Sequence, residues 1–265
     1  DEELITTAIH RNGAIAYAIY DYVRYTGDTH YLGQQGLEVL IGLARFWAQR
    51  VSWSGEKNKY ELLGVTGPDE YTRTGNNNWY TATLAAWTLT YTLQALALVK
   101  QTASTKYEQL EQTLNFEEEK ETGTWQAIIN NLYYPTDEEK GIFLQHDGYL
   151  DKAPSLVKNL DPNQRPVNKH WTQDQLKNAG LMQQADVLLG LYLFEDQYDR
   201  ATIRRNFDFY EPRTLHESAL SPGVHAVLAV NIGDEERAYS YFLQSAPYHL
   251  DNYHNDTQAG CHIPG

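Results

Sequence analysis

The sequence is poor in several features that mark common protein classes. It contains one cysteine, Cys261, which excludes an internal disulfide and a cysteine-rich metal site. It lacks the glycine-rich nucleotide-binding patterns, and no run of eighteen consecutive apolar residues predicts a membrane span. The nine histidines are scattered without the spacing of a metal site, so no metal is expected. Lys and Arg number 21 against 35 Asp and Glu, and a net charge of −14 argues against nucleic acid as a partner.

A secretory signal is also missing from the sequence. The chain opens with Asp1-Glu2-Glu3, without a basic region followed by an apolar one. The lack of disulfides is typical of a reducing compartment. We therefore expect a cytoplasmic location.

Aromatic residues are plentiful, with 20 Tyr, 6 Trp and 7 Phe in 265 residues. They are explained either by core packing or by a carbohydrate site in which flat rings stack on sugars. Composition leaves both explanations open. The hydrophobic fraction of 42% is that of a folded protein with a sizeable core.

Apolar periodicity predicts a mainly helical chain. Residues 3–27 and 29–51 carry apolar side chains at three- and four-residue spacings over an arc wider than one solvent-facing helix requires. Such arcs favour helices packed on two sides, as in a double-layered α-barrel. Further helices are predicted over 79–99, 125–132, 176–194, 200–210, 223–231 and 233–245. Segment 101–121 is acid-rich and predicts a solvated helix or an insertion, and loop-rich 133–165 contains a strand-like run over 141–151.

One rigid loop, residues 64–78, joins a β-like run to the helix predicted from Trp79. Glycines and Pro68 restrict its backbone, and two adjacent acids, Asp69 and Glu70, lie at its centre. A carboxyl group on a rigid loop at a helix entrance suits a general acid. Acids are also common in exposed turns. The loop alone leaves both interpretations open.

Several ordered motifs support the first interpretation by resemblance. The chain resembles the catalytic domain of the inverting α-glucoside phosphorylases and hydrolases, the family of maltose, kojibiose and trehalose phosphorylases. The matching segments are 9–14, 36–40, 64–71, 76–81, 145–151, 184–188, 209–212, 216–218, 220–222 and 260–263. The resemblance implies an all-α fold, an incomplete (α/α)6 barrel with short strands in long loops. It also implies that residues 1–265 are part of a catalytic domain, without the N-terminal β-sandwich, the first barrel helices and the C-terminal β-domain.

The same resemblance implies a mechanism and its residues. Glu70 corresponds to the general acid that protonates the glycosidic oxygen, while inorganic phosphate attacks the anomeric carbon from the opposite face. A maltose-like α-glucoside then yields β-D-glucose 1-phosphate and a free sugar. Ser218 and His262 correspond to phosphate-binding residues. Residues expected to bind substrate are Gln183, Gln184, Trp79 and Asp147. Phosphate is a co-substrate, no cofactor is expected, and family members are expected to be homodimers.

Three departures keep other functions open. Gln183 replaces a family Lys, Ala219 replaces a Ser, and Pro264-Gly265 replaces Thr-Ser. These changes remove donors near phosphate and sugar, and one charge-assisted donor contributes about 1.5–3 kcal/mol. One alternative is an inverting α-glucoside hydrolase with Glu217 as the base, about 6.5–9.5 Å from the acid. Another is a catalytically incompetent fragment or a sugar-binding module.

Overall fold

A computed structural model describes residues 2–246, which are mostly α-helical. The α-helices are α1 (Glu2–Thr7), α2 (His10–Thr26), α3 (Leu37–Arg50), α4 (Trp79–Thr102), α5 (Ser104–Leu114), α6 (Glu118–Asn131), α7 (Gln173–Asn178), α8 (Val187–Leu193), α9 (Arg200–Tyr210), α10 (Leu220–Ile232) and α11 (Glu235–Ser245). Two antiparallel hairpins pair β1 (Ser52–Ser54) with β2 (Lys59–Glu61), and β3 (Thr136–Asp137) with β4 (Ile142–Phe143). The predicted mainly helical fold with short strands in the loops is confirmed.

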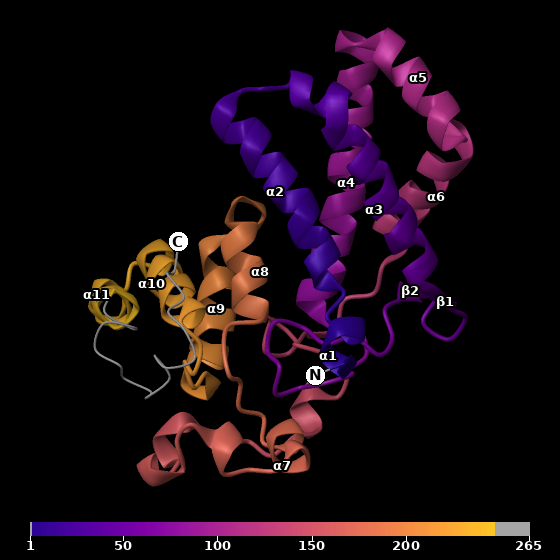
Figure 1. The fold of residues 1–265 in the computed structure, drawn as a ribbon. Coiled ribbons are helices and arrows are strands. Elements are labelled where there is room, and N and C mark those ends of the chain that lie inside the picture. The colour runs from indigo at the N-terminus through magenta and orange to yellow at the C-terminus, as the bar shows by residue number, and fades with distance from the viewer. Residues whose placement is uncertain (1, 247–265) are drawn as a thin grey trace.

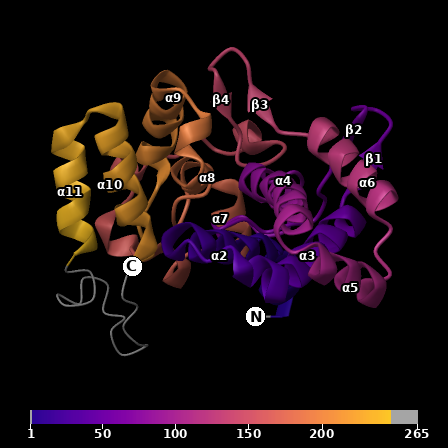
Figure 2. The ribbon, with the colours of Figure 1, turned by 90° about the horizontal axis from the view of Figure 1, so that it is seen from above.

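The helices form two groups that meet at α4 and α8. Figures 1 and 2 show α2 to α6 on one side of the molecule and α8 to α11 on the other. Below them in Figure 1 lie α7 and a series of short turns. The connections that precede α4, α8 and α10 come together at this lower end, where they build the site described below.

Side-chain caps define where several helices begin. Asn78 accepts a hydrogen bond from the backbone N–H of Thr81 at the start of α4. Asp199 caps α9 in the same way, and Asp234 caps α11. These short acceptors satisfy backbone donors that a first helical turn leaves unpaired. Each cap therefore sets the residue at which a loop ends and a helix begins.

The core of the first group is apolar. Leu40, Trp47, Leu89 and Trp125 are all buried there, with α4 packed among α2, α3 and α6. Among residues 2–246, α4 is the one helix long and apolar enough by length and composition to cross a membrane. Because 61% of its most apolar stretch is buried by other elements, the same properties describe a core helix.

The second group has its own core. Met182, Leu188, Phe207 and Leu228 lie fully buried where α8, α9 and α10 pack together. Helix α11 packs along α10 and places Tyr241 in the same cluster. Each group thus buries a continuous apolar cluster, and the loops between them sit on rigid supports.

One predicted segment differs from the structure. The single helix expected over 176–194 is α7 and α8, separated by the non-helical stretch 179–186. Gly180 breaks the helix because its φ is +66° and a Cβ there would lie 2.7 Å from the carbonyl oxygen of Ala153. Segment 101–121 forms α5 and the start of α6, anchored by the buried ring of Phe116, which stacks on Trp125 at 5.7 Å.

Candidate active site

The acid loop is closed at its base by backbone hydrogen bonds. The N–H of Val65 donates to the carbonyl of Gly75 at 2.8 Å, and the N–H of Thr66 donates to the carbonyl of Thr7 at 3.0 Å. Within this frame the two adjacent acids have opposite environments. Asp69 has no exposed surface, whereas Glu70 is half-buried and borders a pocket.

Asp69 is held by donors from three parts of the chain. Its Oδ1 accepts the backbone N–H groups of Gln183 at 2.9 Å and Tyr71 at 3.3 Å. Its Oδ2 accepts the side-chain amide of Gln145 at 2.9 Å. No protein group within residues 2–246 makes a comparable bond to the carboxyl of Glu70. Asp69 therefore anchors the loop, and Glu70 is left available to a ligand.

A second buried carboxylate, Asp186, lies beneath the same loop. Its Oδ2 accepts the backbone N–H of Asp69 at 3.1 Å, and its Oδ1 accepts the side-chain amide of Asn78 at 2.9 Å. A Cβ on Gly67 would lie 2.3 Å from Asp186 Oδ2 and 2.4 Å from Asn78 Nδ2. Glycine is therefore required where the loop crosses these two side chains.

The two carboxyl groups resist ionising together. Burial raises the pKa of Asp186 to about 7, and the nearby charge of Asp69 acts in the same direction. Burial also raises the pKa of Asp69, although hydrogen bonds from Gln145 and Gln183 oppose this. Lys152, whose pKa burial lowers to about 8, donates to the hydroxyl of Thr72 at 2.7 Å and adds positive charge near both acids.

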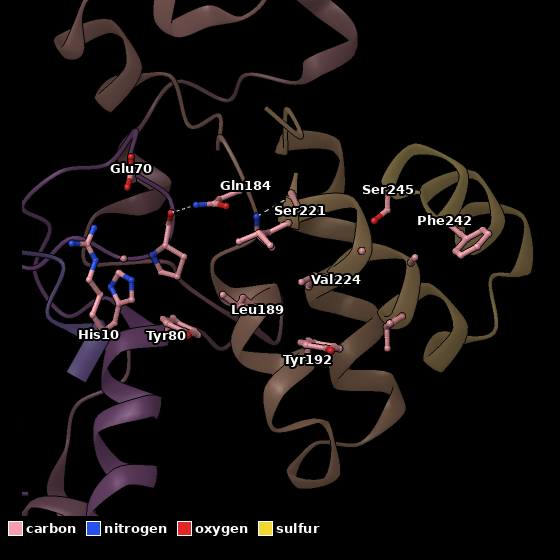
Figure 3. Close-up of a pocket in the computed structure, with 18 of the residues that line it drawn as sticks. His10, Glu70, Tyr80, Gln184, Leu189, Tyr192, Ser221, Val224, Phe242 and Ser245 are labelled. Carbon is pink, nitrogen blue, oxygen red and sulfur yellow. Dashed lines mark hydrogen bonds between the residues drawn. The ribbon is translucent and has the colours of Figure 1, made fainter. Parts of the chain in front are cut away.

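A pocket of about 730 Å³ opens in front of Glu70. One wall is polar and carries His10, Arg11, Glu70 and Gln184. The other wall is apolar and comes from α8, α10 and α11; its residues include Leu189, Tyr192, Val224, Val227 and Phe242. Figure 3 shows His10 and Glu70 on one side of the pocket and Tyr192, Val224 and Phe242 across from them. A volume in this range with few polar groups suits a small-molecule ligand.

The sequence candidate for a hydrolytic base, Glu217, is engaged in contacts with the protein. Its side chain is 3% exposed. Its Oε2 accepts the hydroxyl of Tyr71 at 2.6 Å, its Oε1 pairs with the guanidinium of Arg165 at 3.3 Å, and both oxygens lie 3.2 Å from the N–H of Val167. This carboxylate joins the acid loop to the 152–178 segment and does not border the pocket.

A buried serine connects the pocket to a histidine pair. Ser221 lines the pocket, and its Oγ accepts the backbone N–H of Ala185 at 3.2 Å. The same Oγ lies 3.0 Å from His216 Nδ1, while His225 Nδ1 donates to the carbonyl of Ser221 at 2.9 Å. Burial lowers the pKa of His225 to about 4 and that of His216 well below its usual range. Both rings are therefore neutral supports of this loop at neutral pH.

The structure brings together some of the predicted site residues. Glu70 and Gln184 both border the pocket, and the Gln184 amide donates to the carbonyl of Pro68 at 2.6 Å. Gln183 contributes its backbone to this region, donating to Asp69 and accepting from the N–H of Glu217 at 3.0 Å.

Other predicted residues lie away from the pocket or outside the described chain. Trp79 is buried in the second core with its ring stacked on Phe143 at 4.6 Å. Asp147 accepts from the Asn77 amide at 2.7 Å near the β1–β2 hairpin. Ser218 is half-buried beside the pocket loop and does not line the pocket, and His262 lies outside the described residues.

Three residues of the site were not predicted as such. Asp186, Ser221 and His10 occur within segments that carried the family resemblance, at 184–188, 220–222 and 9–14. The resemblance was the available indication, because a lone Asp, Ser or His in a helical pattern has many explanations. Within residues 2–246, no group of three or more acidic, His or Cys side chains is arranged to hold a metal ion.

Comparison with known proteins identifies the family of this chain. Residues 2–265 match the glycosyl hydrolase family 65 central catalytic domain. The chain is 48% identical to maltose phosphorylase of Bacillus subtilis over 98% of its own length and 33% of that protein. It is 34% identical to an alpha,alpha-trehalose phosphorylase of Thermoanaerobacter brockii over 97% of its length and 33% of that protein. A solved structure of a candidate kojibiose phosphorylase from human microbiome matches with a TM-score of 0.86 at 29% identity, covering 95% of this chain and 36% of that one. The chain thus spans about a third of the length of these relatives.

Proposed function

The chain belongs to glycosyl hydrolase family 65, and from that premise we propose that it carries the acid-catalysed centre of a disaccharide phosphorylase acting on maltose or a close relative. The observation that carries the proposal is the contrast between Asp69 and Glu70. Both carboxylate oxygens of Asp69 accept hydrogen bonds that fix the loop, whereas Glu70 borders a pocket of about 730 Å³.

In the proposed reaction, Glu70 gives its proton to the glycosidic oxygen as the bond to the anomeric carbon breaks. Inorganic phosphate attacks that carbon from the opposite face, so that an α-glucoside yields β-D-glucose 1-phosphate and a free sugar. Ser218 and His262 are the proposed phosphate ligands, with Gln183 and Gln184 near the sugar. Phosphate acts as co-substrate, and no other cofactor is part of the proposal.

Phosphorolysis is favoured over hydrolysis by the position of Glu217. A general base needs a free carboxylate beside the attacking water. Both oxygens of Glu217 instead contact Tyr71, Arg165 and Val167, and the residue does not border the pocket. Phosphate needs no such base, because it is itself the nucleophile.

The wider assignments follow from the same proposal. Apolar arcs that pack on two sides, and a neighbour with a TM-score of 0.86, support a partial (α/α)6 barrel. Dimerisation and a cytoplasmic location, where phosphate is plentiful, are proposed on the family resemblance.

The test uses the full protein that contains this chain. Incubation with maltose should release glucose and form β-D-glucose 1-phosphate only when phosphate is present. Glu70→Gln should reduce this turnover about 100- to 10,000-fold, which is the range that general acid catalysis contributes. The amide keeps the size of the side chain, and circular dichroism checks the fold. Equal glucose release without phosphate would contradict phosphorolysis, and undiminished activity of the variant would contradict the role of Glu70.

A further inference from the structure

The first residue of α2, His10, lies on the polar wall of the pocket and has no role in the chemistry described so far. Its Nδ1 is 3.1 Å from the carbonyl oxygen of Thr66, which belongs to the acid loop. A carbonyl oxygen can only accept, so Nδ1 must carry the proton of this hydrogen bond. The bond therefore orients the ring and determines its tautomer.

The other ring nitrogen, Nε2, is consequently left with a lone pair. Burial lowers the pKa of His10 to about 4, and the adjacent charge of Arg11 acts in the same direction, so the ring stays neutral at physiological pH. Within residues 2–246, the Nε2 atom makes no hydrogen bond. His10 lines the pocket, and its ring packs edge-on against Tyr80 at 5.7 Å, which limits its rotation.

The surroundings of this lone pair determine what it can bind. Figure 3 shows His10 on the same side of the pocket as Glu70, across from Tyr192 and Val224 of the apolar wall. An uncharged acceptor repels anions weakly and offers phosphate no donor, because phosphate oxygens at neutral pH are mainly acceptors. A sugar hydroxyl is a donor and matches it.

We infer that His10 is a sugar-positioning residue whose Nε2 accepts a hydrogen bond from one hydroxyl group of the disaccharide, while its Nδ1–H holds the loop that carries Glu70. This inference rests on the proposed function for the identity of the ligand. The His10 ring thus contacts the sugar through Nε2 and the loop that carries Glu70 through the Thr66 carbonyl, so it links the positions of the sugar and of Glu70.

Two amide substitutions separate the functions of the two nitrogens. In His10→Asn the amide N–H can replace Nδ1–H and keep the bond to Thr66, but no acceptor reaches the place of Nε2. In His10→Gln the longer side chain can place its carbonyl oxygen near the Nε2 position, but the bond to Thr66 is lost. The pair therefore distinguishes sugar contact from loop support in two variants of similar polarity.

Calorimetry with the full protein, in the absence of phosphate, measures this contact directly. Among maltose derivatives that each lack one hydroxyl group, one should bind the wild type about tenfold more weakly than maltose, as expected for one lost hydrogen bond. His10→Asn should bind maltose about tenfold more weakly than the wild type and should not distinguish maltose from that derivative. His10→Gln should keep the distinction. A His10→Asn variant that discriminates among the derivatives as the wild type does would overturn the inference.

A measurement on the unaltered protein covers the case in which a variant does not fold. Nitrogen-15 NMR of the labelled histidines should show the Nε2 resonance of His10 shifting on addition of maltose, and an Nε2 resonance that does not respond would also overturn the inference. Assays with phosphate keep the two proposals apart. If maltose binds through His10 but phosphorolysis does not occur, the proposed reaction alone is contradicted. If phosphorolysis occurs but the Nε2 resonance of His10 does not respond to maltose, this inference alone is contradicted.

Discussion

The apolar core of the first helix group and the acid-loop site are both deeply buried, but different forces hold them. Trp47, Leu89 and Trp125 lie in the core of the first helix group with at most 1% of their surface exposed, and they are surrounded mainly by apolar side chains. In the site, Asp69 and Asp186 have no exposed surface and are held by amide and backbone donors. Burial of apolar area is tolerant of small shifts, whereas a buried carboxylate needs its donors in place.

This difference implies that the two regions fail in different ways. Damage to the helical core should lower the free energy of unfolding and leave the surviving native molecules active. Damage to the site should alter turnover more than its effect on stability would suggest, because the hydrogen bonds of Asp69 and Asp186 determine where Glu70 lies. Substitutions in each region test this distinction.

The largest loss of stability is expected for Trp125→Ala. The ring is buried and packs on Phe116, so its removal leaves a cavity and should lower the free energy of unfolding by about 3–5 kcal/mol. Urea denaturation measures this change, and KM and kcat of the folded fraction should match the wild type. A large change in KM would show that the core and the site are not separable in this way.

Gly67→Ala should have a smaller effect on stability and a larger one on turnover. The added Cβ would contact Asp186 Oδ2 and Asn78 Nδ2 at distances that require one of them to move. Overpacking of this kind costs about 1–3 kcal/mol, and kcat should fall with the displacement of Glu70. Gly123→Ala is the matched control, because this α6 glycine has open space around its Cβ position and should gain up to about 1 kcal/mol. Equal kinetics of the two variants would argue against the role of the Gly67 contact.

The charge of Asp186 predicts a characteristic pH dependence. Its pKa of about 7 in the folded protein lies above the usual 3.8, so the native state holds a proton that the unfolded state releases. This contribution is fully present below pH 4 and is lost as pH rises toward 7, at a rate of at most about 1.4 kcal/mol per pH unit. Relative to the wild type, Asp186→Asn should therefore become steadily more stable between pH 4 and pH 7 in thermal or urea unfolding. A difference that stays constant over this window would contradict the protonation assigned to Asp186.

The smallest effect is expected at a surface ion pair. Lys100 and Glu118 are 2.7 Å apart, but their side chains are 45% and 33% exposed. Solvent screens such pairs, so Lys100→Ala should change the free energy of unfolding by no more than about 1 kcal/mol and leave turnover unaltered. An effect as large as that of Gly67→Ala would mean that carboxylate contacts matter alike in both regions.

Much of the fold could be predicted because helices are encoded locally. Apolar spacing predicted helices over 3–27, 29–51 and 79–99, and the structure has α2, α3 and α4 in those segments. The break between α7 and α8 was missed because apolar residues recur on both sides of it, from Leu176 to Phe194. Gly180 has a left-handed backbone and a Cβ there would lie 2.7 Å from the carbonyl oxygen of Ala153, a contact that periodicity cannot reveal.

The site was only partly predictable for a related reason. Glu70 could be named because glycines, Pro68 and a family resemblance surround it. Trp79 and Asp147 have residue types suited to sugar binding. In the structure, however, the Trp79 ring is buried in the second core, and the Asp147 carboxylate accepts a hydrogen bond from Asn77. Asp186 acquires its role through contacts with residues more than a hundred positions earlier, which no local pattern encodes.

The cap of α4 has a dynamic consequence. Asn78 uses its oxygen for the N–H of Thr81 and its amide for Asp186 and the carbonyl of Gln145. Fraying of the first turn of α4 must therefore release the buried acid as well. In native-state hydrogen exchange, the amides of Asp69 and Thr81 should open as one cooperative unit, far more slowly than loop amides usually exchange. Asn78 and Asp186 thus tie the loop that carries Glu70 to the first turn of a core helix.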